Sequence, residues 1–197
     1  MKPHSEASER NKDPILQVLK QWFTQPGRVI EIGAGTGQHA VHFASHLPHL
    51  DWLPTDVEEN LPGIRLWTGE ASLPNLRAPV RLDVHDVEWP ASDVDYVYTA
   101  NTAHIMSWPE VELMFAGVGK TLRPKGTFCL YGPVNRDGQF TSESNRAFDE
   151  ALRRQDPNMG VRDDRALVAL GKRCGLRFAG DHSMPAKNRL LVWTRGG

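Results

Sequence analysis

Cysteine and long apolar runs are what this sequence most clearly lacks. The chain has two cysteines in 197 residues, Cys129 and Cys174, and neither belongs to a Cys-x-x-Cys pair. This excludes a disulfide framework and a cysteine-based zinc site, and two independent thiols fit a reducing cytoplasm. No segment approaches the ~20 consecutive apolar residues that cross a bilayer, and residues 1–14 contain no apolar stretch typical of a signal peptide. We therefore expect a cytoplasmic protein without a membrane partner.

An excess of charge of one sign is also missing. The formal net charge is -1 at pH 7, so the chain has no bulk attraction for nucleic acid, and we expect no nucleic-acid partner. Hydrophobic residues make up 40% and charged residues 24% of the chain, which is typical of a globular protein. The length favours a single domain, residues 1–197, and no repeat, low-complexity tract or linker interrupts it.

Helix and strand patterns alternate along the chain. Short β-branched runs such as residues 28–32 and 94–100 are typical of buried strands, and the amphipathic segments between such runs predict helices. Asp13 or Ser8 would cap the first helix, with Pro14 in its opening turn. The pattern predicts further strands at 51–56, 80–83, 127–131, 176–178 and 190–194, and further helices at 38–47, 59–73, 108–122, 144–155 and 162–174. Such alternation indicates an α/β fold with a mostly parallel sheet.

A glycine-rich loop joins the first strand to the helix after it. It comprises Gly33, Ala34, Gly35, Thr36 and Gly37, and the acidic Glu31 precedes it. Glycines let a ligand approach the backbone closely, and the following helix directs free N–H groups at that ligand. A dinucleotide-binding loop reads GxGxxG, but the last glycine of that pattern is replaced here by Gln38. The spacing therefore favours S-adenosylmethionine (SAM), which has no diphosphate.

Two further acids stand where a nucleoside would bind. Asp56 ends the second predicted strand, and a carboxylate there can accept hydrogen bonds from ribose hydroxyls. Asp83 ends the third, where it could accept one from the adenine amino group, with Val84 against the ring. Because the carboxyl ends of parallel strands meet at one edge of a sheet, both acids face the crevice of the glycine loop.

These positions resemble the class I, Rossmann-like, SAM-dependent methyltransferases. The loop from Glu31 to Gly37 is similar to their first motif, Asp56 to their second and Asp83-Val84 to their third. Asn101 matches the position of their fourth motif. The resemblance implies a three-layer Rossmann-like sandwich whose seven-stranded sheet is mostly parallel, with the last strand antiparallel.

A closer resemblance covers nearly the whole chain. It is to a small methyltransferase-like family labelled as a domain of unknown function, and it implies a fold and a cofactor but no settled substrate. The segments that carry it are Ala7-x-x-Arg10-Asn11-x-x-Pro14-Ile15, Gly35-Thr-Gly-Gln-His39, Phe140-Thr-Ser-x-Ser-Asn145, Asp156-Pro-x-Met-Gly160-Val-Arg-Asp163 and Met184-Pro-Ala-x-Asn188. In the resembled fold an N-terminal helix, here within residues 1–25, often covers the cofactor. Either Arg10 or Asn11 would then reach the SAM carboxylate, or the segment is solvated.

Candidates for the methyl-acceptor end follow the fourth and fifth strands. His104 could take a proton from the acceptor, since its unperturbed pKa is near 6.5, or it orders its loop by hydrogen bonding. Asn101 could orient the acceptor or line the cofactor site. The long polar segment within residues 132–165 is typical of a functional loop, and we interpret it as a cover over the substrate.

A metal site is not expected. His39, His42 and His46 share one face of a predicted helix, but no carboxylate or cysteine completes a ligand set. His39 alone is a candidate, because it lies one turn into the cofactor-binding helix.

Three functions are compatible with the sequence. The leading one is methyl transfer from SAM to an O, N or S atom of a small-molecule acceptor. The alternatives are an NAD-dependent oxidoreductase and a SAM-binding protein without catalysis. The sequence does not predict an oligomeric state.

Overall fold

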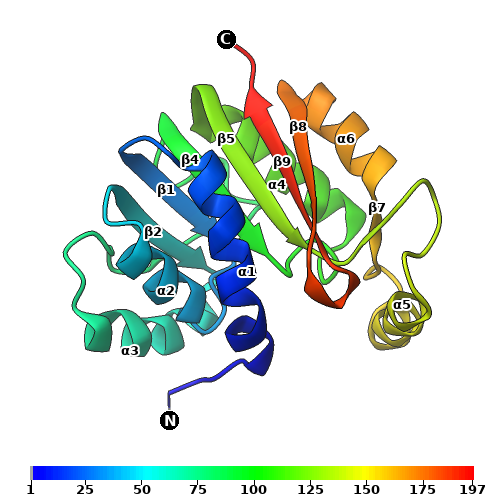
Figure 1. Cartoon of the computed structure of the whole chain (residues 1–197), viewed down its shortest axis with the longest axis horizontal. Coiled ribbons are helices and arrows are strands. Elements are labelled where there is room, and N and C mark those ends of the chain that lie inside the picture. Colours follow the sequence, from blue (N-terminus) through cyan, green and yellow to red (C-terminus); the bar gives the residue numbers. More distant parts are fainter. Residues whose placement is uncertain (1) are drawn as a thin grey trace.

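A seven-stranded sheet forms the middle of the computed structural model, which describes residues 2–197 (Figure 1). The strand order is β3-β2-β1-β4-β5-β9-β8. The five strands from β1 to β5 run parallel, whereas β9 is antiparallel to both β5 and β8. This confirms the predicted fold class, including the antiparallel last strand. The strands are β1 (Gly27–Ile32), β2 (Leu50–Asp56), β3 (Val80–Arg81), β4 (Val94–Ala100), β5 (Leu122–Gly132), β8 (Leu176–Ser183) and β9 (Arg189–Arg195).

Helices cover both faces of this sheet. On one face lie α1 (Glu6–Trp22) and α2 (Gln38–His46), with α3 (Leu61–Ala71) beside α2, and on the other lie α4 (Trp108–Thr121) and α6 (Asp164–Arg173). Beyond the carboxyl edge of the sheet lies α5 (Glu143–Gln155). The short strands β6 (Val134–Asn135) and β7 (Arg162–Asp163) pair in parallel next to it.

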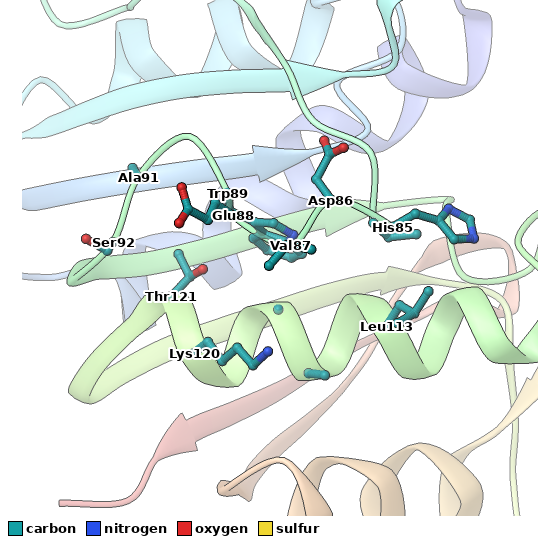
Figure 2. Close-up of a pocket in the computed structure, with 13 residues that line it drawn as sticks. His85, Asp86, Val87, Glu88, Trp89, Ala91, Ser92, Leu113, Lys120 and Thr121 are labelled. Atoms are coloured by element: carbon teal, nitrogen blue, oxygen red, sulfur yellow. The ribbon is translucent and has the colours of Figure 1, made fainter.

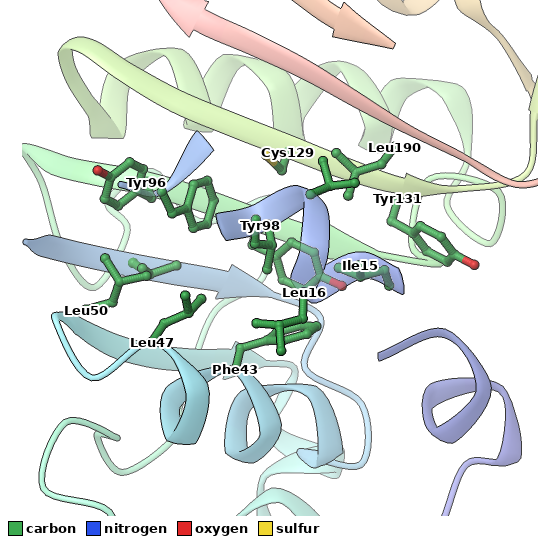
Figure 3. Packing of buried hydrophobic residues seen from close by; sticks show 14 of the residues in the cluster. Ile15, Leu16, Phe43, Leu47, Leu50, Tyr96, Tyr98, Cys129, Tyr131 and Leu190 are labelled. Carbon is green, nitrogen blue, oxygen red and sulfur yellow. The ribbon is translucent and has the colours of Figure 1, made fainter. Parts of the chain in front are cut away.

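The two cores follow from the strict alternation of side chains along the strands. In β1, Val29 packs into the core under α1 and α2, and Ile30 packs into the core under α4 and α6. Figure 3 shows the first core, where Ile15 and Phe43 meet Tyr98 of β4. Because both faces are covered, the central strands bury side chains on both sides, as parallel strands require.

The first helix begins eight residues earlier than Pro14 indicates, so the predicted opening turn at Pro14 is wrong. Ser5 is the N-cap, and its side chain accepts a hydrogen bond from the backbone N–H of Ser8 at 3.2 Å. Pro14 lies inside the helix. It removes one backbone donor there, and burial of the apolar face around Ile15 and Leu19 offsets the loss.

Two other predicted features can be compared with the structure. The strand predicted at 80–83 is shorter, because the chain turns after Arg81 and Asp86 donates its backbone N–H to the Asp83 carbonyl at 2.9 Å. Both cysteines are free, with Cys129 buried in β5 and Cys174 half-buried, which confirms the expectation of separate thiols. Among residues 2–197, no helix has the length and apolar character needed to cross a membrane.

Candidate cofactor and acceptor site

The glycine loop turns sharply between β1 and α2. Gly33 and Gly35 have φ angles of 69° and 59°, a left-handed conformation that costs other residues about 1–2 kcal/mol. A Cβ on Gly33 would lie 2.6 Å from the Thr102 methyl group, so this glycine lets the loops after β1 and β4 touch. A Cβ on Gly35 would meet nothing within 4 Å. The backbone at Gly35 is therefore open to a ligand.

A cavity of about 870 Å³ lies over this loop, near the upper end of the about 300–1,000 Å³ range of small-molecule sites. The carboxyl ends of β1, β2, β4 and β5 open into it, together with the N-terminal segment, α5 and the residue before β9. Eight of the sequence-predicted site residues line it: Glu31, Gly33, Ala34, Gly35, His39, Asp56, Asn101 and His104. The fold thus brings together both predicted ends of the site.

Asp56 clamps the glycine loop from the end of β2. Its Oδ2 accepts the backbone N–H of Gly35 at 2.7 Å, and its Oδ1 accepts the backbone N–H of Val57 at 2.8 Å and the side chain of Asn60 at 2.9 Å. A carboxylate offers about four acceptor positions. Asp56 therefore shapes the loop and retains capacity for a hydroxyl of a bound ligand.

Glu31 is a buried acid at the base of the cavity. It is only 2% exposed and accepts a hydrogen bond from the Trp52 indole N–H at 2.8 Å. The pKa of Glu31 is raised from 4.5 to about 8, chiefly by burial; the bond from Trp52 opposes the rise and the charge of Asp56 adds to it. A carboxyl in this state is protonated near neutral pH and ionises readily once a cation lies beside it.

His39 connects the cavity to the first helix. Its Nε2 lies 2.7 Å from Oδ1 of Asn11, and its Nδ1 lies 3.2 Å from the hydroxyl of Tyr98. Since Oδ1 of Asn11 can only accept, Nε2 carries the proton and Nδ1 accepts from Tyr98. Burial lowers the pKa of His39 to about 4, so the ring is neutral. Asn11 itself acts behind His39 and does not line the cavity.

The structure places four other predicted residues outside the cavity lining. Arg10 is exposed and lies 3.7 Å from Glu6. Gly37 is the N-cap of α2 and packs against α3. Asp83 turns toward His85, accepting its backbone N–H at 3.0 Å. Val84 lines a second cavity of about 490 Å³ between the segment 84–92 and α4 (Figure 2).

His104 lines the cavity from the loop after β4, whereas the acids come from β1, β2 and the segment after β2. It is 7% exposed, and its ring meets the edge of Phe148 from α5 at a centroid distance of 5.2 Å. Burial, and secondarily the charge of Arg162, lowers the pKa of His104 to about 4. The imidazole is therefore neutral at pH 7 and presents a free lone pair, although the same shift makes it a weaker base than an exposed histidine.

Arg162 fixes the loop that carries His104. Its guanidinium donates to the backbone carbonyls of Ala103 at 2.9 Å, of Asn158 at 3.0 Å and of Met106. The backbone N–H of Gly160 also donates to the His104 carbonyl at 2.9 Å. The segment before α6 thus holds the catalytic candidate by its main chain.

Among the cavity residues that the sequence does not single out as site residues are Phe148, Asn145 and Asn188. The amide nitrogen of Asn145 donates to the Thr141 hydroxyl at 2.8 Å and to the Lys187 carbonyl at 3.2 Å. Asn188 donates to the Tyr131 hydroxyl at 2.9 Å. The available signal was that Asn145 and Asn188 end two of the segments carrying the narrower family resemblance, and that His39 and Arg162 lie in two others. These segments meet around the cavity.

Gln38, in the position of the missing glycine, ties the N-terminus to this site. Its Oε1 accepts the backbone N–H of Ser5 at 2.6 Å, and its amide donates to Glu9 at 2.6 Å. A glycine could make neither bond.

The clustered histidines contact different partners, since His42 lies 3.0 Å from Asp13 while His39 contacts Asn11. Within residues 2–197 no group of three or more His, Cys, Asp or Glu is arranged to hold a metal ion.

Comparisons with known proteins agree with this architecture. A family model described as "Protein of unknown function (DUF938)" matches residues 2–195. An O-methyltransferase family protein from Burkholderia thailandensis superposes with a TM-score of 0.84 at 16% identity, over 98% of this chain and 58% of its own. An O-methyltransferase family 2 protein from Planctomyces limnophilus, solved with apigenin, superposes with a TM-score of 0.84 at 11% identity, over 96% of this chain and 58% of its own.

Human N-acetylserotonin methyltransferase, solved with SAM, gives a TM-score of 0.79 at 16% identity, over 98% of this chain and 53% of its own. The chain therefore spans little more than half the length of the solved structures it matches. At these identities the similarity establishes the Rossmann-like methyltransferase fold.

Proposed function

This chain belongs to the family described as "Protein of unknown function (DUF938)", and we propose that it transfers a methyl group from SAM to an O, N or S atom of a small-molecule acceptor. The proposal concerns the cavity over the glycine loop. The solved structures that share the fold include methyltransferases bound to SAM or to its product, which supports methyl transfer as the general chemistry.

The charge of the cavity is the observation that carries this proposal. Asp56 and Glu59 line it together with Glu31, which ionises once a cation lies beside it. Among residues 2–197 no Lys or Arg side chain lines it. SAM carries an ammonium, a sulfonium and a carboxylate, so its net charge is positive. Opposite charges attract by about 4 kcal/mol at 4 Å for an effective dielectric constant near 20. The same acids would repel a dinucleotide diphosphate, which disfavours the NAD-dependent alternative.

The residues present fit SAM as a cofactor. Glu31 would face its cationic amino-acid part above the glycine loop, and Asp56 would accept a ribose hydroxyl. Val57, beside Asp56 in the cavity lining, is better placed than Val84 to contact the adenine ring. Asp83 would reach the adenine only if the segment 83–92 moved. When bound, SAM supplies an electrophilic methyl group on a positively charged sulfur.

The acceptor would then bind between the loop after β4 and α5. Methyl transfer depends on placing the nucleophile in line with the methyl group and excluding water. The main-chain bonds from Arg162 and Gly160 fix His104 for this task. Its neutral ring would take the proton that the acceptor loses.

A thermal-shift experiment with a matched pair of variants tests this function. SAM at 100 times its Kd should stabilise the protein by about 2.7 kcal/mol, which raises Tm by roughly 5–10 °C at this chain length, and NAD should give no shift. Asp56→Asn should abolish most of the SAM shift. Asp51→Asn changes an acid of the same strand that pairs with Arg77 outside the cavity, and it should keep the shift.

Stabilisation by NAD and not by SAM would overturn the proposal in favour of the oxidoreductase. A protein that binds SAM but methylates no member of a broad panel of hydroxyl, amine and thiol compounds would instead be the non-catalytic SAM-binding alternative.

A further inference from the structure

The end of the cavity around His104 has no charged lining. The side chains there are those of Asn101, His104, Ile105, Asn145, Phe148 and Asn188, and the three lining acids all lie near the glycine loop. Burying an unpaired charge costs several kcal/mol. An anionic acceptor, such as a carboxylate or a phosphate, would find no cation at this end to offset that cost.

A cationic acceptor is disfavoured for a different reason. Arg162 is the nearest cation behind this end, and its guanidinium is committed to three backbone carbonyls. Arg162 does not line the cavity and so offers no direct contact to an anion, but its positive charge would disfavour an ammonium group near His104. The sulfonium proposed to bind beside it adds a second repulsion. These charges select a neutral acceptor.

The apolar surface at this end suits an aromatic ring. Phe148 is 39% exposed and Ile105 is 50% exposed, although both line the cavity. Large apolar side chains left open within a cavity indicate a ligand with a matching apolar face. A ligand ring would pack on Phe148 in the offset or edge-on geometries that aromatic groups prefer, as the His104 ring does.

Two polar atoms mark where the reacting group of this ligand would lie. A Cβ on Gly132 would lie 3.8 Å from both Oδ1 of Asn101 and Nδ1 of His104, so these two atoms of cavity-lining residues lie close to each other. Neither ring nitrogen of His104 forms a hydrogen bond with any of residues 2–197. A hydroxyl group there would donate its proton to Nδ1 of His104.

We propose that the methyl acceptor is a neutral phenol whose ring packs on Phe148 and whose hydroxyl donates to His104. This inference rests on the proposed methyl transfer. The phenol oxygen takes the methyl group while the carbon–sulfur bond breaks and leaves its electron pair on sulfur. Nδ1 of His104 takes the hydroxyl proton and later releases it to solvent. The products are an aryl methyl ether and a neutral sulfide.

Binding of four compounds with the same ring tests the charge of the acceptor. We would titrate p-cresol, p-toluate, p-methylbenzylammonium and p-toluidine into protein saturated with S-adenosylhomocysteine, and follow binding by ligand-observed NMR. We expect p-cresol to bind at least about ten-fold more tightly than either ion, a difference of about 1.4 kcal/mol. Equal or tighter binding of either ion would overturn the inference. Methylation of p-toluidine and not of p-cresol would overturn the choice of a hydroxyl acceptor.

Two matched pairs of variants test the location. Phe148→Ala should weaken p-cresol binding about five-fold, as loss of an aromatic contact does. Phe178→Ala, at a phenylalanine of β8 with similar exposure, should not weaken it. Ile105→Arg supplies the missing cation and should make p-toluate bind at least as tightly as p-cresol. Leu66→Arg places the same charge on an equally exposed residue of α3 outside the cavity lining and should leave the preference unchanged.

The outcomes separate this inference from the proposed function. Failure of the wild-type protein to bind S-adenosylhomocysteine or SAM would refute the cofactor and the acceptor together. Normal binding of S-adenosylhomocysteine combined with no p-cresol preference, or with no effect of Ile105→Arg on p-toluate, would refute the phenol alone.

Discussion

Replacing Glu31 with Gln should stabilise the ligand-free protein above pH 7 and weaken its affinity for SAM. The carboxyl is 2% exposed and lies at the base of the cavity. Gln has nearly the same shape and keeps an oxygen to accept the indole N–H of Trp52, which is 2.8 Å from the Glu31 carboxyl. The substitution therefore removes the ionisable group and changes little of the packing.

The magnitude follows from the difference in the pKa of Glu31 between the two states. The pKa is about 8 in the folded protein and 4.5 for the exposed group, so between these values the folded state binds one more proton than the unfolded state. The free energy of unfolding then falls as pH rises. At about 1.4 kcal/mol for each pH unit, the ionisable side chain of Glu31 lowers the free energy of unfolding by at most about 3 kcal/mol at pH 7.

His39 and His104 impose the opposite slope at lower pH. Burial lowers the pKa of each to about 4 from 6.5, so the unfolded state binds more protons and stability is lost as pH falls from 6.5 toward 4. The wild-type protein should therefore be most stable near pH 6.5 and lose about 1 kcal/mol between pH 6.5 and pH 8, where the loss from Glu31 outweighs the remaining gain from the two histidines.

Urea unfolding followed by tryptophan fluorescence at pH 5, 6.5 and 8 measures these slopes. Glu31→Gln should remove the loss between pH 6.5 and 8 and retain the loss below pH 6.5. Glu59→Gln, at an exposed acid of the same cavity, should behave like the wild type. The reasoning is refuted if the wild type keeps its stability up to pH 8, or if Glu31→Gln loses as much as the wild type.

Three further predictions concern single substitutions. Gly35→Ala should cost about 1–2 kcal/mol, because φ is 59° there, and its methyl group should enter the cavity and lower SAM affinity; unchanged SAM binding by calorimetry would argue against a ligand at this loop. Arg162→Gln should destabilise the protein by about 2–3 kcal/mol, the worth of hydrogen bonds from a charged donor, and should raise the pKa of His104 in an NMR titration of its ring protons; an unchanged pKa would show that the charge does not reach the ring. Ser107→Ala removes the capping box that Ser107 and Glu110 form at the start of α4, and should cost about 1 kcal/mol in urea unfolding, with no change in SAM binding.

The sequence predicts the elements of this fold that depend on local pattern. Runs such as residues 28–32 and 94–100 carry β-branched and aromatic residues and form the buried strands β1 and β4 in the middle of the sheet. Glu31 and Asp56 lie where the pattern places them, because each is tied to the end of a buried strand. Their positions follow once the strands are known to be parallel.

The positions of the other site residues depend on the conformation of the loops, and the hydrophobic pattern of the sequence does not predict loop conformation. Asp83 and Val84 follow a two-residue strand, and the bond from His85 to Asp83 directs that carboxylate away from the cavity lining. Phe148 and Asn188 come from segments 40 residues apart that meet only in the folded chain. No periodicity signals such a meeting. Pro14 predicts a later start for the first helix, because proline is a strong local sign of a helix start, whereas Ser5 is the actual cap.

The central claim is that the acidic cavity over the glycine loop binds SAM. Calorimetric titration with SAM at pH 7, in two buffers of different ionisation enthalpy, tests it most directly. We predict one SAM bound for each chain, with release of about one proton as Glu31 ionises beside the cation, no proton release in Glu31→Gln, and no heat from NAD. Binding of NAD in place of SAM, or binding of SAM without proton release by the wild type, would contradict the account.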